Sequence, residues 1–170
     1  MDEINIQFFK TKYGELILGS FDNYLVMCDW RYRKMRHNID NRLQIKLNAI
    51  YKEKDNNTLK IARQQLNEYF EYRRNSFDIP VKLIGTEFQK KVWQRLTKIP
   101  YGKTTSYLEL ANNISNTKAV RAVANANGAN AISIIVPCHR VIGKNGALAG
   151  YAGGVATKKN LLKLEQNLFA

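Results

Sequence analysis

The sequence of 170 residues is poor in the residues that cross-link small proteins or bind metal ions. It has two cysteines, two histidines and three prolines. Two thiols, Cys28 and Cys138, are too few for a disulfide framework. Together with His37 and His139 they lack the spacing of a zinc site. We therefore expect no metal and no cofactor, and a fold stabilised by a hydrophobic core, which a chain of this length can form.

Long apolar runs are also missing. No stretch of about eighteen apolar residues occurs, so the sequence predicts no membrane-spanning helix. The first residues, Met1 to Asn5, have neither the basic region nor the apolar region of a secretory signal. These absences favour a cytoplasmic protein with no membrane partner.

Acidic residues become scarce in the second half of the chain. The formal net charge is +13. Residues 1–80 contain 14 Lys and Arg against 11 Asp and Glu, whereas residues 81–170 contain 13 against 3. Such a positive field attracts phosphate backbones or anionic membranes. A lysine-rich composition bias is the alternative, but it does not explain the loss of carboxylates. Since no amphipathic helix with a basic face stands out, nucleic acid is the expected partner.

The first half, residues 1–80, predicts a small α/β domain. Apolar alternation between turns predicts three strands of an antiparallel meander, at 4–8, 16–18 and 24–28. Helical spacing of apolar residues then predicts two helices, over 45–51 and 59–70. Cys28 falls within the third strand and is expected to be a buried small hydrophobic residue. No chemistry is evident in this half, so we expect it to have a structural role.

The second half, residues 81–170, predicts a mainly helical domain. The expected elements are a short strand at 81–83, a helix from Thr86 to Leu96, two short helices at 106–112 and 117–126, a buried strand at 132–136, a glycine-rich loop at 143–154 and a final helix. The two short helices fit a helix-turn-helix, because three or four residues join them. The second one carries small side chains and the cations Lys118 and Arg121, which suits a DNA groove. Two ordinary core helices are the alternative.

Cys138 has neighbours that could activate a thiol. Thiolate is the reactive form of cysteine and forms readily beside a base, here His139, either directly or through a water. A base of this kind needs a carboxylate to fix its tautomer. Glu165 is the candidate, because it lies among leucines of the final helix and a carboxylate there is costly unless paired. A solvated helix glutamate is the alternative. The same helix is expected to bury Leu161, Leu162, Leu164 and Leu168 and to leave Lys158, Lys159 and Lys163 more exposed.

The segment from Pro137 to Val141, Pro-Cys-His-Arg-Val, resembles the active site of the O6-alkylguanine-DNA alkyltransferases, also called methylated-DNA–protein-cysteine methyltransferases. The resemblance covers roughly residues 84–168 at matching spacings. It also rests on Thr105-Ser106-Tyr107, the run from Lys118 to Val123, the run from Gly150 to Gly154 and the run from Leu161 to Glu165. Residues 1–80 fit the family's variable N-terminal domain only in outline. The implied fold is this small α/β domain followed by a mainly α, winged helix-turn-helix-like domain.

The resemblance implies direct reversal of DNA damage by a chain that acts once. An alkyl group, typically methyl, passes irreversibly from O6-alkylguanine, flipped out of duplex DNA, to Cys138. O4-alkylthymine is a second candidate substrate. The implied partner is double-stranded DNA carrying the lesion, with no obligate protein partner and a monomeric chain.

Roles for individual residues also follow from the resemblance. His139 is the base, acting through a water, and Glu165 is its partner. Tyr107 contacts the 3′ phosphate and guanine N3. Arg121 fills the gap left by the extruded base, and Ala119 and Ala122 lie on the same DNA-binding helix. In the substrate pocket the backbone carbonyls of Cys138 and Val141 accept from the guanine amino group, and the Ala152 amide reaches O6. Tyr151 packs on the base, and Lys158 closes the far side of the pocket. Asn130 is the hinge between the recognition helix and the active-site segment.

Two positions depart from the family pattern. Ala131 replaces the usual proline after the hinge asparagine, which predicts a less restrained turn. Ala152 replaces a frequent serine, so a side-chain hydroxyl is absent there. The metal ligands of some animal members are missing, and so is the cysteine cluster of the bifunctional adaptive-response proteins.

Two other functions compete with alkyl transfer. A winged-helix regulator explains the charge and the helices, but it leaves Cys138, His139 and Glu165 without a purpose. A cysteine hydrolase needs an oxyanion site and multiple turnovers. A covalent adduct on Cys138 separates alkyl transfer from both.

Overall fold

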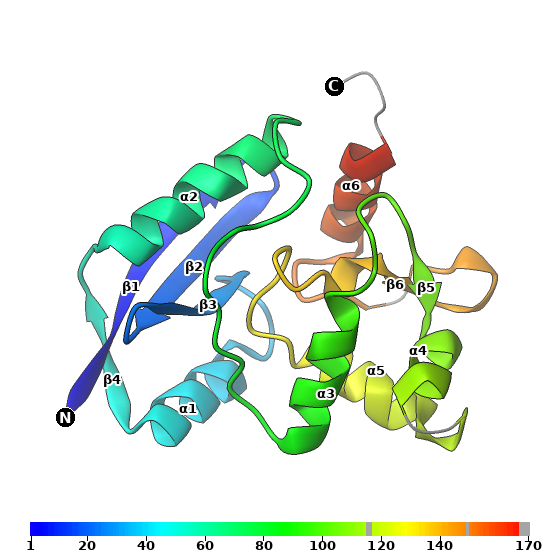
Figure 1. Cartoon of the computed structure of the whole chain (residues 1–170), viewed down its shortest axis with the longest axis horizontal. Helices are drawn as coiled ribbons and strands as arrows, with labels where there is room; N and C mark the ends of the chain where they lie inside the picture. Colours follow the sequence, from blue (N-terminus) through cyan, green and yellow to red (C-terminus); the bar gives the residue numbers. More distant parts are fainter. Residues whose placement is uncertain (115–116, 149, 167–170) are drawn as a thin grey trace.

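The computed structural model describes residues 1–114, 117–148 and 150–166. A four-stranded sheet with two helices occupies one side of the molecule, and the remaining helices gather on the other side (Figure 1). The chain passes between the two sides through an extended segment between α2, Asn57–Phe70, and α3, Glu87–Leu96. This arrangement agrees with the predicted order of an α/β half followed by a helical half.

The sheet of the first half is mixed. β1 (Asp2–Thr11), β2 (Gly14–Phe21) and β3 (Tyr24–Trp30) form the predicted antiparallel meander. A fourth strand, β4 (Ala49–Glu53), pairs in parallel with β1, so the sheet order is β3-β2-β1-β4. The sheet places the carboxyl end of β3, at Trp30, facing the second half of the chain.

The first predicted helix was wrong in its position. α1 spans Arg36–Leu47, and the residues around Ile50 belong to β4 instead. Asn48 ends the helix, because it adopts the left-handed conformation with φ 47° that commonly closes a helix C-terminus. Only Ile39 and Leu43 are buried on α1, so its apolar pattern is weak and sequence periodicity alone does not locate it.

Helices α1 and α2 cover opposite faces of the sheet. On one face Ile17 and Met27 pack in a cluster with Leu43 of α1. On the other face Leu16 and Leu18 pack in a cluster with residues of α2 and of the second half. This alternation follows from the two-residue period of a strand. The face under α2 therefore joins both halves of the chain into one core.

The second half is built on three mutually packed helices: α3, α4 (Tyr107–Ile114) and α5 (Val120–Gly128). Thr86 caps α3 in a reciprocal capping box with Gln89, as its sequence predicts. A 3-10 turn, Thr117–Ala119, precedes α5. The predicted linker between α4 and α5 lies partly outside the described residues. Helix α6, Val155–Gln166, closes the fold against the 3-10 turn Cys138–Arg140.

Two predicted strands of the second half are not strands. The segment 132–136 is a series of turns in which only Ile132 forms a bridge, to Cys28, and Ile134 has φ 70°. Burial of the segment was predicted correctly, but a buried apolar run does not by itself reveal its backbone conformation. Likewise Val81 forms only an isolated bridge, with Leu25. A short parallel pair does occur elsewhere, between β5 (Thr105–Ser106) and β6 (Val141–Ile142), followed by a 3-10 turn at Lys144–Gly146.

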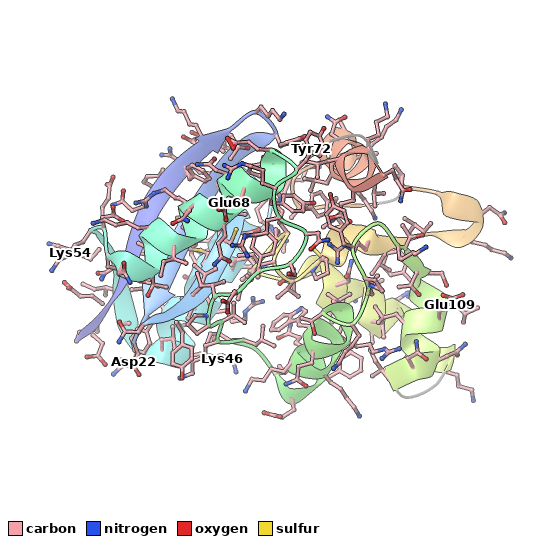
Figure 2. The ribbon with its side chains drawn as sticks, turned by 45° about the horizontal axis from the view of Figure 1, so that its top comes forward. Asp22, Lys46, Lys54, Glu68, Tyr72 and Glu109 are labelled. Atoms are coloured by element: carbon pink, nitrogen blue, oxygen red, sulfur yellow. The ribbon has the colours of Figure 1, made fainter. Side chains whose placement is uncertain are left out.

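Acidic side chains lie at the surface in both halves of the chain. Figure 2 shows Asp22 and Glu68 on the first half, and Glu109 on α4. Among the described residues no helix is long and apolar enough to cross a membrane. The division into domains at residue 80 remains a prediction, since the larger core contains residues from both halves.

Candidate active site

Cys138 opens the 3-10 turn that follows Pro137, and its side chain is almost fully buried, with 4% of the residue exposed. Backbone hydrogen bonds hold the turn: the Cys138 amide donates to the Val136 carbonyl at 2.8 Å, and the Arg140 amide donates to the Pro137 carbonyl at 3.0 Å. The short pair of β5 with β6 aligns Thr105 with Val141. This pairing brings the start of α4, where Tyr107 lies, next to the cysteine turn.

His139 and Glu165 form the buried pair that the sequence predicts. Nε2 of His139 lies 2.7 Å from Oε2 of Glu165, and both side chains are fully shielded from solvent. An ionised carboxylate only accepts, so Nε2 carries the proton and the other ring nitrogen, Nδ1, carries a lone pair. Within the described part of the chain Nδ1 is buried and has no hydrogen-bond partner. The imidazole is therefore poised to accept a proton at Nδ1.

The Glu165 carboxylate receives several further donors that sequence reasoning missed. The Tyr69 hydroxyl donates to Oε2 at 2.5 Å, and the Arg140 guanidinium donates to both oxygens, at 2.8 and 3.1 Å. Burial alone raises the pKa of Glu165, but the hydrogen bonds and charges of His139 and Arg140 outweigh it and lower the pKa to about 2. Glu165 is thus ionised at neutral pH. The sequence does not predict the contact of Tyr69 with Glu165, because Tyr69 fits the apolar face of its helix.

Burial also decides the protonation of the two groups at the reacting end. It lowers the pKa of His139, an effect that Glu165 partly opposes, so the imidazole is neutral. Burial raises the pKa of the Cys138 thiol, whereas hydrogen bonding by the Asn130 side chain and the charges of Arg33 and Lys158 lower it. The resting thiol is consequently protonated. Its proton must leave before the sulfur can act as a nucleophile.

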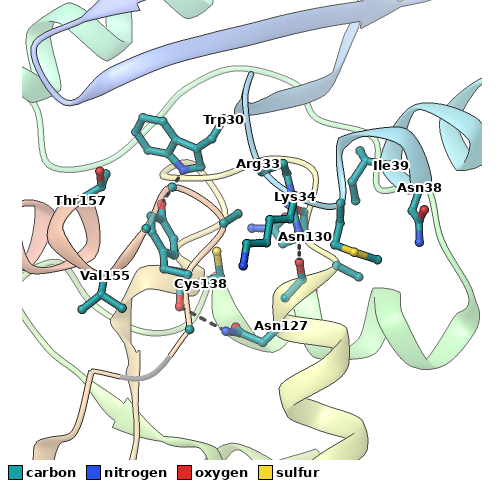
Figure 3. A pocket seen from close by; sticks show the side chains of 18 of the residues that line it. Trp30, Arg33, Lys34, Asn38, Ile39, Asn127, Asn130, Cys138, Val155 and Thr157 are labelled. Atoms are coloured by element: carbon teal, nitrogen blue, oxygen red, sulfur yellow. Dashed lines mark hydrogen bonds between the residues drawn. The ribbon is translucent and has the colours of Figure 1, made fainter.

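Cys138 lines an open pocket of about 1440 Å³. Figure 3 shows the sulfur between Trp30, from the end of β3, and Asn127, from α5, with Lys34 reaching into the same space. Tyr151 and Ala152 of the glycine-rich loop also line it. The indole Nε1 of Trp30 donates to the Tyr151 hydroxyl at 3.1 Å, which ties this loop to the first half of the chain. Sequence reasoning did not predict that the first half forms part of the pocket wall.

Tyr107 lines this pocket, and Lys158 lies close to its ring. Burial and the nearby Cys138 raise the pKa of the Tyr107 hydroxyl, and a hydrogen bond with the Asn127 side chain partly offsets the rise. The ammonium of Lys158 lies 5.9 Å from the centre of the Tyr107 ring. The prediction that Lys158 is more exposed was wrong: it is fully buried, and within the described residues its Nζ has no hydrogen-bond partner. The helix turns this one lysine inward, while Lys159 and Lys163 remain exposed as predicted.

Asn130 organises the turn between α5 and the cysteine. Its side-chain amide donates to the carbonyls of Val136 at 2.9 Å and Ile132 at 3.3 Å, and its oxygen accepts from the Ile132 amide at 2.9 Å. Three bonds from one side chain connect the end of α5 to the segment that leads into Cys138. Ala131 follows within this turn, and its residue is 6% exposed.

The structure does not bring the predicted DNA-binding residues of α5 into the pocket. Arg121 and Ala122 are exposed on the helix, and Ala119, in the preceding turn, is half-buried. None of them lines the space around Cys138. The cysteine site and the exposed start of α5 are thus two separate features on one rigid group of helices.

Two family models match nearly the whole chain. The DNA-binding domain of 6-O-methylguanine DNA methyltransferase matches residues 87–167, and the ribonuclease-like domain of the same family matches residues 4–83. The chain belongs to the 6-O-methylguanine DNA methyltransferase family. The family predicted from the cysteine motif is therefore confirmed, and so is the fold class.

Relatives in this family are similar over long stretches. The constitutive methylated-DNA–protein-cysteine methyltransferase of Bacillus subtilis is 43% identical over an alignment of 163 positions, which covers 92% of each chain. The methylated-DNA–protein-cysteine methyltransferase of Methanosarcina acetivorans is 58% identical over 104 residues, covering 61% of this chain and 67% of that protein.

Solved structures of the family have the same fold. The O6-methylguanine methyltransferase of Mycobacterium tuberculosis superimposes with a TM-score of 0.80 at 37% identity, over 96% of this chain and 93% of that one. The OGT of Mycobacterium tuberculosis, solved in complex with DNA, gives a TM-score of 0.79 at 36% identity, over 96% and 92% of the two chains.

Proposed function

We propose that Cys138 accepts an alkyl group from O6-alkylguanine in duplex DNA, in a single irreversible event. The chain is a methylated-DNA–protein-cysteine methyltransferase that repairs DNA by direct reversal. The observation that supports the assignment of Cys138 is the buried His139–Glu165 pair beside it, in which Nδ1 of His139 has no hydrogen-bond partner among the described residues.

The transfer is a displacement at the alkyl carbon. The Cys138 proton passes to Nδ1 of His139 through a water, and Glu165 stabilises the imidazolium that forms. The thiolate then attacks the carbon, so that the new sulfur–carbon bond forms as the carbon–O6 bond breaks. The guanine departs with the electron pair of that bond and accepts a proton at its N3 atom. We assign the Tyr107 hydroxyl as the donor of this proton. The thioether has no hydrolytic route back, so each molecule acts once.

The pocket receives a base that has left the duplex. Extrusion costs a few kcal/mol, and a weakened pair lowers that cost. Tyr151 packs on the base, the Ala152 amide donates to O6, and the carbonyls of Cys138 and Val141 accept from the amino group. Lys158 closes the far side. Asn130 holds the cysteine segment in place through its three hydrogen bonds.

Helix α5 supplies the contact with DNA. Arg121 occupies the gap left by the extruded guanine, and Ala119 and Ala122 allow the helix to approach the groove closely. We further propose that the protein works as a monomer in the cytoplasm, with no obligate protein partner. The first 80 residues have a mainly structural role in this scheme, and O4-alkylthymine remains a second candidate substrate.

Mass spectrometry after incubation with duplex O6-methylguanine tests the assignment. We expect one adduct, about 14 Da heavier, that maps to Cys138, because one methyl group replaces one thiol proton. Cys138→Ser abolishes the adduct and keeps affinity for DNA, since the charge and the helices remain.

Cys28→Ala is the matched control, because Cys28 is also buried but lies in β3, where burial and the neighbouring Asp29 carboxylate raise the pKa of its thiol. It should form the adduct normally. Binding of DNA without any adduct on the wild-type chain would instead favour a winged-helix regulator, and repeated ester or amide cleavage would favour a hydrolase.

A further inference from the structure

Two arginines from the first half of the chain bind the carboxyl end of helix α5. Arg33 donates to the Gly128 carbonyl at 2.6 Å and to the Asn130 carbonyl at 3.3 Å. Arg42 donates to the Ala129 carbonyl at 2.9 Å. Three consecutive carbonyls at the end of the DNA-contacting helix are thus held by side chains that come from another part of the fold.

A helix end is the place where such donors have the largest effect. The last carbonyls of a helix have no partner within it, and the aligned peptide dipoles make this end partially negative. The indole Nε1 of Trp93 satisfies one more of these groups, the Ala126 carbonyl, at 2.8 Å. Two guanidinium groups therefore supply both the missing donors and the complementary charge.

The two arginines are themselves fixed. The Arg33 side chain is 6% exposed and pairs at 3.2 Å with Asp29, a fully buried carboxylate on β3. Arg36 pairs with the other oxygen of Asp29 at 2.9 Å. Arg42 lies 5.2 Å from the centre of the Trp93 ring. Because these side chains are already held in place, each hydrogen bond to α5 costs less side-chain conformational entropy.

The same turn is held from its other side by β3. The Cys28 amide donates to the Ala131 carbonyl at 2.8 Å, and the Ser133 amide donates to the Cys28 carbonyl at 2.6 Å. The sequence predicts a loosened turn at this point, because Ala131 lacks the ring of the usual proline. The structure shows instead a turn that external hydrogen bonds restrain on both sides.

We propose that Arg33 and Arg42 are positioning residues, which set the placement of α5 relative to Cys138 and take over the restraint that a proline would give. This inference rests on the proposed function. The first half of the chain then affects catalysis indirectly, because Asp29 holds Arg33, and Arg33 and Arg42 hold the end of α5.

The two arginines have separable effects. Arg42 donates to the Ala129 carbonyl at the helix end and lies over the Trp93 ring of α3, and neither contact involves the cysteine segment. It therefore governs how a base extruded by α5 meets the pocket. Arg33 also contacts Asn130, whose side chain holds the segment leading into Cys138. The His139–Glu165 pair depends on neither arginine, because Tyr69 and Arg140 hold Glu165.

Rates of alkyl transfer from duplex O6-methylguanine and from free O6-benzylguanine test this separation. Misplacing a reacting group by about 1 Å can cost a hundredfold in rate, so we expect Arg42→Met to slow the duplex reaction by at least about tenfold. The same variant should change the free-base reaction by less than about twofold, since no helix placement is needed there. Arg33→Met should slow both reactions.

Arg63→Met is the matched control, because Arg63 pairs with Asp55 on the surface of the first half. It should behave as wild type with both substrates. If Arg42→Met matches this control on duplex DNA, or slows both substrates equally, the positioning role is refuted. If the wild-type chain itself reacts with neither substrate, the proposed function fails, and the two failures are distinguishable.

Arg42→Lys keeps the charge and most of the packing if the methionine variant does not fold. It should restore part of the duplex rate. Hydrogen exchange on the Arg42→Lys protein should be faster than in wild type at residues 128–133 and unchanged around Glu165. Unchanged exchange at 128–133 would overturn the proposal.

Discussion

Glu165 is a residue on which several buried polar contacts converge. Its carboxylate accepts from the Tyr69 hydroxyl, the His139 imidazole and the Arg140 guanidinium, and it is 3% exposed. A buried charge is stable only when it is paired and hydrogen-bonded in this way. One side chain therefore has two consequences, since it fixes the tautomer of His139 and joins α2 to α6.

The depressed pKa of Glu165 predicts a stability that depends on pH. The pKa is about 2 in the folded chain and 4.5 when unperturbed. A carboxyl group with a depressed pKa stabilises the fold at any pH above its pKa in the unfolded chain. This stabilisation, on the order of 3 kcal/mol, is lost as the pH falls through its pKa in the folded chain. The lowered pKa of His139 acts in the same direction, from pH 6.5 downward. We expect the free energy of unfolding, measured by urea titration, to decrease from about pH 6.5 and more steeply below pH 4.5.

Glu165→Gln should remove the steep part of this dependence and slow alkyl transfer at neutral pH, because an amide does not stabilise the imidazolium. Glu87→Gln is the control, since the Glu87 side chain is 95% exposed. The same steep loss of stability in Glu165→Gln would mean that another carboxylate is responsible.

At the scale of elements, α5 connects an exposed surface at its start with the cysteine pocket at its end. Its start is exposed and carries Arg121, while its end lines the pocket at Asn127 and is bound by arginines from the first half. A helix of this length transmits position well, because its hydrogen bonds make it a stiff rod. In the proposed mechanism, one helix therefore sets the distance between the DNA contact of Arg121 and the chemistry at Cys138.

The exposed start of α5 predicts different effects on two substrates. Arg121→Ala should slow repair of duplex O6-methylguanine by at least about tenfold, because no side chain then fills the gap in the base stack. It should leave the reaction with free O6-benzylguanine nearly unchanged, as measured by adduct formation over time.

Arg95→Ala on α3 is the comparison, since Arg95 is also an exposed helix arginine. Equal slowing of Arg121→Ala on both substrates would contradict a role in base extrusion.

At the scale of the whole molecule, charge and core are organised differently. The core is shared, because residues of β2, α2, α3 and α6 meet in one cluster. Most of the excess positive charge lies in the second half of the sequence, where 13 Lys and Arg face 3 Asp and Glu. An excess of positive charge attracts a phosphate backbone, which speeds encounter without requiring sequence-specific contacts.

This charge distribution predicts a steep salt dependence of DNA binding. The logarithm of the association constant for undamaged duplex should fall linearly with the logarithm of salt concentration, with a slope of about −0.9 for each phosphate contacted. Fluorescence anisotropy at several salt concentrations measures the slope.

Lys54→Gln should leave the slope unchanged, because Lys54 lies on the far side of the sheet from α4 and α5 (Figures 1 and 2). A wild-type affinity that is independent of salt would contradict electrostatic binding.

Local chemistry determined much of this protein. The motif around Cys138, the lone carboxylate among leucines at Glu165 and the loss of acidic residues after Glu87 are all readable from the chain, because each depends on residue type and spacing. The meander and the cap at Thr86 were readable for the same reason, since turns, two-residue alternation and capping boxes are local.

Only the tertiary structure decided which distant residues meet. In the structure Tyr69 and Arg140 donate to Glu165, Lys158 is buried, and part of a predicted helix forms β4. Trp30 reaches the pocket wall, and Arg33 and Arg42 reach the end of α5. The physical reason is that these contacts join residues far apart in the sequence. Their partners are selected by burial and by the need to satisfy buried donors and acceptors, which no local pattern records.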